Sequence, residues 1–413
     1  MPRTIHHTFG PHVDRASVSR MLRLSYAPWK YVRGGEGEKL RTELKEVVDG
    51  EAFLFASGRE SLLAVLKAMN VQPGDEVIVQ GYTCVVVPNA VQAAGCIPIY
   101  ADIDPDTLNL TVETVSEKLS PRTRAVIVQH TFGIPGPVSA LRTLLRGKNI
   151  GLIEDMAHVL VDRTDDRYGR EGDYCILSFG RDKAISGVAG GAVVSRNRVT
   201  SNALRVLEAK AQDVSCWTVL RHLEYGPRMH SIVRPFAGTV FAKICIKILT
   251  YLQLIEPVLT AREKEGVMPR TLQRLPNACA ALTRDSLKKL KNINQHRRML
   301  TDLYLDAAKK NGWTYPTSIS ADLPLQKFPI FVQGADQIRR ELRKQKIFLE
   351  DGWNTCTICP MDVSAEKVGY TQGSDPQAES VCMQILSLPT HPLTTREDAG
   401  KVLQIVKTLL VSN

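Results

Sequence analysis

The feature of this sequence that most constrains its fold is a regular alternation of short apolar runs and helix-spaced runs between residues 53 and 194. Short apolar runs bounded by turn residues indicate buried strands, and the runs between them repeat at helical spacing. The predicted strands cover residues 53–56, 76–80, 97–101, 125–128, 151–155 and 174–177, and the predicted helices cover 57–69, 83–94, 112–119 and 138–145. This alternation predicts an α/β fold, with a mostly parallel mixed sheet flanked by helices.

The alternation stops after Val194, and a second, smaller α/β domain is predicted towards the carboxyl terminus. Its predicted elements are helices over 278–305, 337–345 and 396–410, and strands over 328–332 and 384–388. A chain of 413 residues is long enough for two domains. We therefore expect an N-terminal segment (1–50), a large α/β domain (51–227), an apolar helical insertion (228–270) and a small C-terminal domain (271–413).

The stretch from Gly151 to Gly191 carries the residues that indicate chemistry. Asp155 ends one predicted strand, Ser178 follows the next, and Lys183 lies five residues further on in a glycine-flanked turn. Ligands of parallel sheets collect outside the carboxyl ends of the strands, where these side chains should meet. An aldehyde cofactor with a pyridine nitrogen and a phosphate needs an acid, phosphate donors and a lysine. The stretch thus predicts a pyridoxal-phosphate (PLP) enzyme with Lys183 as the cofactor-binding lysine.

A second part of the predicted site is Ser57-Gly58, immediately before a helix. A serine and a glycine at a helix start leave backbone N–H groups that can bind an anion such as a phosphate. The alternative is an ordinary N-cap with no ligand, and the motif alone favours that alternative. Thr83 and His130 also fall at predicted strand ends, so the shared location strengthens the site prediction.

Composition and charge narrow the class of ligand. The formal net charge is +10, which suits an anionic ligand such as a nucleotide diphosphate. The basic residues are scattered, without an arginine-rich run or a zinc pattern, so we do not expect a nucleic-acid partner or a metal site. The nine cysteines are irregularly spaced, the only CxxC is Cys356–Cys359, and no apolar signal-peptide core is present, so we expect a reducing cytoplasmic location.

An unusually apolar segment covers residues 228–262, with Lys243 and Lys247 in its middle. These lysines argue against a membrane span, and their spacing of four places both on one face of a helix. The segment therefore predicts an amphipathic helix with a large apolar side. Packing within the protein or against a second subunit is one interpretation, and contact of residues 232–258 with a membrane surface is the other.

Several motifs, taken together in order and spacing, resemble the DegT/StrS-type PLP-dependent sugar aminotransferases, which have the aspartate-aminotransferase (type I) fold. The resemblance covers roughly residues 35–210 and 270–410. It is carried by Ser57-Gly58, Pro73-Gly-Asp-Glu-Val77, Asp102-Ile-Asp-Pro-Asp-Thr-Leu108, Pro121-Arg-Thr-Arg-Ala125, Glu154-Asp155-Met-Ala-His158, Ser178-Phe-x-x-x-Lys183, Gly190-Gly-Ala-Val-Val194 and Leu386-Ser-Leu-Pro-Thr-His-Pro392.

The resemblance implies catalytic roles for three residues. Asp155 would pair with the pyridine nitrogen and keep it protonated, and His158 would lie against the cofactor near its ring. Lys183 would bind the cofactor covalently and then move the proton between the substrate α-carbon and the cofactor. Nearby cationic or apolar groups would favour the neutral amine that this step requires.

The resemblance also implies the remaining cofactor contacts and shows where this chain departs from the family. Ser178 and the backbone amides of Gly58 and Arg59 would hold the phosphate, with Arg59 standing where threonine is common. Cys84 occupies the position where an aromatic residue usually stacks on the cofactor ring. Leu272 aligns with an asparagine that commonly reaches the partner subunit's phosphate.

The function implied by the resemblance is transfer of an amino group, from glutamate, to a keto group on a nucleotide-linked sugar in polysaccharide or glycoconjugate biosynthesis. A homodimer is implied as well, because the active site of the family lies at a dimer interface. Two alternatives are a different PLP reaction on a keto-sugar, such as dehydration, and a non-catalytic PLP-fold binding or regulatory protein. Dehydrating members commonly replace the lysine with histidine, so Lys183 disfavours the first alternative.

Overall fold

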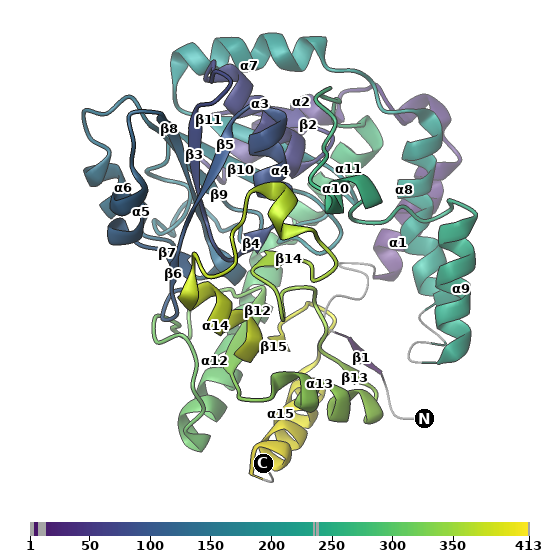
Figure 1. The fold of residues 1–413 in the computed structure, drawn as a ribbon. Coiled ribbons are helices and arrows are strands. Elements are labelled where there is room, and N and C mark those ends of the chain that lie inside the picture. Colours follow the sequence, from purple (N-terminus) through teal and green to yellow (C-terminus); the bar gives the residue numbers. More distant parts are fainter. Residues whose placement is uncertain (1–3, 7–13, 234–235, 237–238, 412–413) are drawn as a thin grey trace.

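The computed structural model describes residues 4–6, 14–233, 236 and 239–411 (Figure 1). Parts of the predicted N-terminal segment and of residues 232–258 lie outside the described residues. A central sheet of seven strands has the order β2-β11-β10-β9-β8-β3-β5. Its strands are β2 (Glu51–Phe55), β3 (Glu76–Gln80), β5 (Ile97–Ala101), β8 (Thr123–Gln129), β9 (Gly151–Asp155), β10 (Tyr174–Ser178) and β11 (Gly191–Ser195). Only β11 runs antiparallel to its neighbours, so the predicted mostly parallel mixed sheet is confirmed.

Helices cover both faces of this sheet. The helices around it are α2 (Glu36–Lys45), α3 (Gly58–Ala68), α4 (Val86–Ala93), α5 (Val112–Lys118), α6 (Val138–Leu144) and α7 (Arg198–Lys210). Leu63 of α3 packs in one core cluster with Val79 and Ile153, whereas Leu141 of α6 packs on the opposite face with Ile78 and Leu152. Burial on both faces explains why the strands read as continuous apolar runs.

The carboxyl-terminal part is a smaller α/β unit that packs beneath the sheet (Figure 1). Its elements are α12 (Leu290–Asn311), β12 (Lys327–Phe331), α13 (Ala335–Lys344), β13 (Ile347–Phe348), β14 (Ile358–Cys359), α14 (Pro376–Gln384), β15 (Ile385–Pro389) and α15 (Arg396–Val411). The preceding helix, α11 (Asn277–Leu287), packs against α2 instead. Strands β12 and β15 form an antiparallel pair. One core cluster joins this unit to the sheet, and the predicted four-part division of the chain stays a prediction.

Two predicted helices differ from the structure. Residues 83–94 are not one helix, because Thr83–Cys84 form a short strand, β4, and the helix starts only at Val86. Strand β4 pairs with β14, a partner far away in the sequence that local patterning could not reveal. The predicted helix over 278–305 is divided into α11 and α12, whose caps meet at Lys288 and Lys289.

A helical group stands at one edge of the molecule (Figure 1). It contains α1 (Arg15–Ser25), α8 (Cys216–Arg228), a π-helical turn (Met229–Val233) and α9 (Val240–Tyr251). A third core cluster joins α1 and α8 to α11, and Ala242 and Leu249 anchor α9 in it. Within the described ranges, no helix has both the length and the apolar character needed to cross a bilayer.

Candidate active site

The predicted site residues gather where the central strands end. Asp155 is the last residue of β9 and Ser178 is the last residue of β10, and these two strands are hydrogen-bonded neighbours. The His130 amide, just after β8, donates to the Asp155 carbonyl at 3.2 Å. The parallel strands therefore deliver an acid and a hydroxyl to one edge of the sheet, as the sequence pattern predicts.

Asp155 is a half-buried acid that is held in one orientation. Its Oδ1 accepts the backbone N–H of Ala157 at 2.9 Å, which fixes the carboxylate in an Asx-type turn. Burial raises the pKa of Asp155, while the Ala157 amide and the charge of Lys183 oppose that rise. A cationic partner such as a protonated ring nitrogen would favour the ionised carboxylate at this position.

Lys183 lies at the centre of the electrostatic environment of the site. Its backbone N–H donates to the Gly180 carbonyl at 3.4 Å, within the turn that follows β10. The charge of Lys183 acts on Asp155, on His158 and on the neighbouring Asp182. Burial disfavours ionised Asp182, but Lys183 and other cations outweigh burial and lower its pKa.

His158 belongs to an aromatic cluster that the sequence did not reveal. Its Nδ1 accepts the Phe132 backbone N–H at 3.1 Å, and its ring stacks on Phe132 with centroids 5.8 Å apart. The Trp353 ring lies edge-on to the His158 ring, with centroids 4.9 Å apart. Burial, followed by the charges of Lys183 and Lys327, lowers the pKa of His158 well below its ordinary value. The imidazole is therefore neutral at physiological pH, with its proton on Nε2 because Nδ1 is an acceptor.

Lys327 and Asp351 form a buried ion pair beside this cluster. Their side chains are 3% and 1% exposed, and the Nζ–Oδ2 distance is 2.8 Å. The Lys327 ammonium also lies 4.8 Å from the Phe132 ring centroid and 5.4 Å from that of Trp353. The carboxyl-terminal unit thus contributes a charged pair and a tryptophan to the wall of the site.

The opposite end of the site is a cradle of backbone groups at the start of α3. Ser57 is the N-cap of this helix, and its Oγ accepts the Glu60 N–H at 3.2 Å. A Cβ atom on Gly58 would come within 2.9 Å of the Ser178 side chain, and one on Gly191 would come within 2.5 Å of the Gly58 nitrogen. Glycine at both positions permits this close approach, which places the Ser178 hydroxyl beside the free N–H groups of the helix.

The side chains of Arg59 and Glu60 are held by a distant part of the chain. The Arg59 guanidinium pairs with Glu263 and donates to the Val258 carbonyl at 2.7 Å. A carboxylate oxygen of Glu60 accepts the Gln273 N–H at 2.6 Å. Burial raises the pKa of Glu60 to about 7, although the Gln273 amide and the Ser57 hydroxyl act against that rise. Arg59 therefore has its backbone N–H, and not its side chain, at the cradle.

Cys84 lies on the short strand β4, where it pairs in register with Cys359 of β14. Burial raises the pKa of its thiol, while the charge of Lys183 has the opposite effect. Cys84 is therefore a neutral thiol within electrostatic reach of the central lysine. Tyr82, the nearest aromatic residue in sequence, points into the core, where its hydroxyl donates to the Trp353 carbonyl.

Comparison with known proteins places this arrangement in a family. The sequence profile of the DegT/DnrJ/EryC1/StrS aminotransferase family matches residues 17–233 and 260–407. The erythromycin biosynthesis sensory transduction protein EryC1 of Saccharopolyspora erythraea is 25% identical over 404 residues, which are 95% of each chain.

Solved structures share the fold. Helicobacter pylori PseC, an aminotransferase involved in the biosynthesis of pseudoaminic acid, superposes with a TM-score of 0.76 at 17% identity and full coverage of both chains (100% each). NtdA from Bacillus subtilis, solved with the bound cofactor PMP, superposes with a TM-score of 0.70 at 20% identity, covering 97% of this chain and 83% of that one.

The fold and the site define a PLP-dependent enzyme of the aminotransferase class. The chain belongs to the DegT/DnrJ/EryC1/StrS aminotransferase family, a family of PLP-dependent sugar aminotransferases. The predicted family, fold class and cofactor are thereby confirmed.

The described residues fit this cofactor at both ends. The glycine-lined cradle at Ser57–Gly58 and Ser178 suits a phosphate, and the half-buried carboxylate of Asp155 suits a protonated ring nitrogen. When bound, PLP supplies an aldehyde that accepts amino groups and a ring that withdraws electrons. The individual roles of Lys183 and of the other predicted contacts remain predictions.

Proposed function

We propose that the enzyme transfers an amino group from glutamate to a keto group of a nucleotide-linked sugar, in polysaccharide or glycoconjugate biosynthesis. The observation that carries this proposal is the match to the DegT/DnrJ/EryC1/StrS aminotransferase family over residues 17–233 and 260–407, and the glycine-lined cradle beside Ser178 supports it. The formal charge of +10 supports a substrate that bears a diphosphate.

In this proposal, each residue of the ring end has a separate task. Asp155 keeps the ring nitrogen protonated, and the Nε2–H of His158 donates a hydrogen bond near the ring. The amine of Lys183 would take the proton from the substrate α-carbon and pass it to the cofactor. Ser178 and the N–H groups of Gly58 and Arg59 hold the phosphate.

The test is a two-stage measurement on the purified holoenzyme. We expect a visible absorbance band of the bound cofactor that borohydride abolishes and that Lys183→Ala removes, whereas Lys148→Ala, at an exposed lysine, keeps it. Added glutamate should bleach the band and release 2-oxoglutarate, and a set of keto-sugar nucleotides should then restore it. A protein that gains no band with added PLP would favour the non-catalytic alternative, and a band unresponsive to glutamate would favour dehydration.

We further propose that the enzyme is a cytoplasmic homodimer whose residues 232–258 contact the inner membrane surface. All nine cysteines are free, which supports a reducing compartment. Leu272 aligns with the asparagine that in the family reaches the phosphate of the partner subunit. In this chain, however, the Leu272 side chain is buried within its own subunit. Sedimentation velocity should give a dimer, and a monomer that transfers amino groups at full rate would contradict this proposal.

A further inference from the structure

The outer side of α9 is apolar and faces away from the protein. Ala242 and Leu249 anchor the helix, and the exposed residues on the other side are Val240, Phe241, Ile244, Ile248 and Tyr251. Tyr251 is 86% exposed and Val240 is 73% exposed. At 3.6 residues per turn these side chains share an arc of about 100°, which is the width of stripe that a helix ordinarily buries.

Positive charge borders this stripe. Lys243 and Lys247 are exposed and lie one turn apart along one side of it. Between Arg228 and Glu256 the sequence contains no Asp or Glu. The helix therefore presents an apolar face with a basic flank, which is the pattern of helices that lie in the interface of an anionic membrane.

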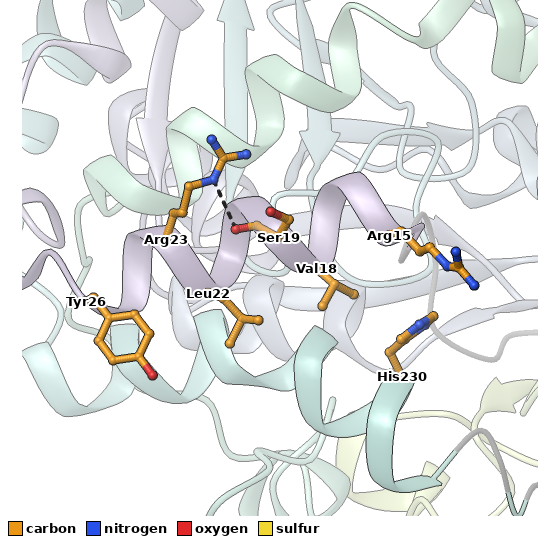
Figure 2. Close-up of a pocket in the computed structure, with 7 residues that line it drawn as sticks. All are labelled: Arg15, Val18, Ser19, Leu22, Arg23, Tyr26 and His230. Atoms are coloured by element: carbon orange, nitrogen blue, oxygen red, sulfur yellow. Dashed lines mark hydrogen bonds between the residues drawn. The ribbon is translucent and has the colours of Figure 1, made fainter.

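A shallow basic hollow lies next to the start of this segment (Figure 2). It has a volume of about 310 Å³ and is formed by one side of α1 and by the π-helical turn that leads towards α9. Its lining residues are Arg15, Val18, Ser19, Leu22, Arg23, Tyr26 and His230. Tyr26 and the nearby Trp29 are 82% and 73% exposed. Cationic and aromatic side chains of this kind are favoured at the headgroup level of a bilayer.

The shape and position of the surface favour a bilayer over a protein partner. The stripe runs along a single helix at the edge of the molecule, away from β4 and β14 at the site (Figure 1). It falls within residues 234–259, the stretch that the family profile leaves unmatched. An isologous contact between two copies would bring like-charged basic flanks of both helices into the same interface, which is unfavourable.

We infer that the outer side of α9, together with the hollow beside α1, docks on the headgroup region of an anionic lipid bilayer. This inference rests on the proposed membrane contact of residues 232–258, and it is independent of the proposed reaction. The apolar side chains would enter the interface while Lys243, Lys247 and the arginines of the hollow face lipid phosphates. The enzyme would then be held at the surface without a spanning helix.

Vesicle flotation of the holoenzyme tests the inference. We expect binding to vesicles of phosphatidylcholine with phosphatidylglycerol, weaker binding to pure phosphatidylcholine, and a decrease as salt rises. Lys243→Glu with Lys247→Glu should weaken binding by about 25-fold or more, at about 5-fold for each lysine. Phe241→Ser with Ile248→Ser should weaken it by at least about tenfold.

Matched variants on other surfaces distinguish vesicle binding through α9 from nonspecific adsorption of the protein to vesicles. Val199 and Val206 are exposed on α7 at the same spacing of seven residues, and Lys309 and Lys407 are exposed lysines elsewhere. Val199→Ser with Val206→Ser, and Lys309→Glu with Lys407→Glu, should leave vesicle binding unchanged. Circular dichroism and the absorbance of the bound cofactor verify that each variant is folded.

Three results would overturn the inference. The first is a folded wild-type holoenzyme that does not float with anionic vesicles at low salt. The second is vesicle binding that the α9 variants leave unchanged. The third is a wild-type protein that does not bind vesicles, combined with a Phe241→Ser, Ile248→Ser variant that no longer self-associates in sedimentation velocity. This result would assign the surface to contact with a second copy of the chain. A wild-type holoenzyme that binds vesicles but shows no aminotransferase activity would refute only the proposed reaction.

Discussion

At the ring end of the site, Asp155 and His158 are fixed by neighbouring strands and by an aromatic cluster. At the phosphate end, Arg59 and Glu60 are fixed by Glu263 and Gln273, which lie 204 and 213 residues further along the chain. The ring end therefore combines neighbouring strands of the sheet with Trp353 of the carboxyl-terminal unit, whereas the phosphate end depends on how the segment around α10 (Ala261–Lys264) packs on α3. In the proposed reaction, the first arrangement would carry the chemistry and the second would control how the cofactor is held.

The difference also lies in electrostatics. At the ring end, burial and then the charges of Lys183 and Lys327 lower the pKa of His158, and the same two cations lower the pKa of Asp182. At the phosphate end, a half-buried carboxyl group, Glu60, lies in the first turn of the helix that would bind an anion. An ionised carboxylate there would repel a phosphate, so the two ends should respond differently to mutation and to pH.

The largest effect is expected at the ring end from Lys183→Ala. Loss of the group that moves the proton should reduce amino transfer by about 10³-fold or more. The initial rate of 2-oxoglutarate formation with glutamate measures this, with Lys148→Ala as the matched exposed lysine. A folded Lys183→Ala protein that keeps a tenth of the wild-type rate would show that another group carries the proton.

A loss of folding stability is expected from Lys327→Met. The substitution removes the ammonium group that pairs with the buried Asp351 carboxylate and should lower the free energy of unfolding by about 3–5 kcal/mol. Adding Asp351→Leu removes the buried carboxylate as well and should recover most of the lost free energy of unfolding. Urea unfolding measures both variants, and an equal loss in the double variant would show that packing, and not charge, explains the effect.

An exposed pair supplies the control for this comparison. Lys310 and Asp306 also approach to 2.8 Å, but their side chains are 73% and 63% exposed. Solvent screens such a pair, so Lys310→Met should leave the urea midpoint unchanged.

How far the sequence predicted these two ends depends on how local their contacts are. Asp155, Ser178 and Lys183 follow predicted strands within one stretch, so strand alternation alone placed them together. Trp353 and the Lys327–Asp351 pair reach the site only because the carboxyl-terminal unit docks beneath the sheet, which no local pattern encodes. The fold class followed from the alternation, because burial on both faces leaves a strong apolar signal.

Two other features show what the spacing of apolar residues in the sequence cannot predict. The β4 strand was predicted as part of a helix, because its partner β14 is distant in the sequence. The apolar spacing of α9 correctly indicated an amphipathic helix, but spacing cannot state whether the apolar side faces the protein or the solvent. Long-range packing decides both questions.

At the phosphate end, Glu60→Gln should stabilise the protein in a pH-dependent way. Because the folded pKa of about 7 lies above the ordinary value of 4.5, the unfolded chain loses its proton first as pH rises. Wild-type stability therefore falls between about pH 4.5 and 7, by about 3 kcal/mol in total, and the glutamine variant avoids this loss. Urea unfolding of both proteins without cofactor, at pH 5 and pH 8, measures it. A difference that is equal at both pH values would mean that Glu60 is ionised throughout.

The smallest effect is expected from Arg59→Met on cofactor affinity. Because Glu263 and the Val258 carbonyl hold the guanidinium, only the backbone N–H of Arg59 is available to the phosphate, and the substitution keeps that group. The dissociation constant for PLP, measured by absorbance titration, should change by less than about threefold, whereas Ser178→Ala should raise it about tenfold or more by removing a hydrogen bond to a charged group. A tenfold loss in Arg59→Met would show that the guanidinium leaves Glu263 to bind the phosphate. The side chains at the phosphate end would then rearrange when the cofactor binds. The ring end would be formed before binding, whereas the phosphate end would be formed by it.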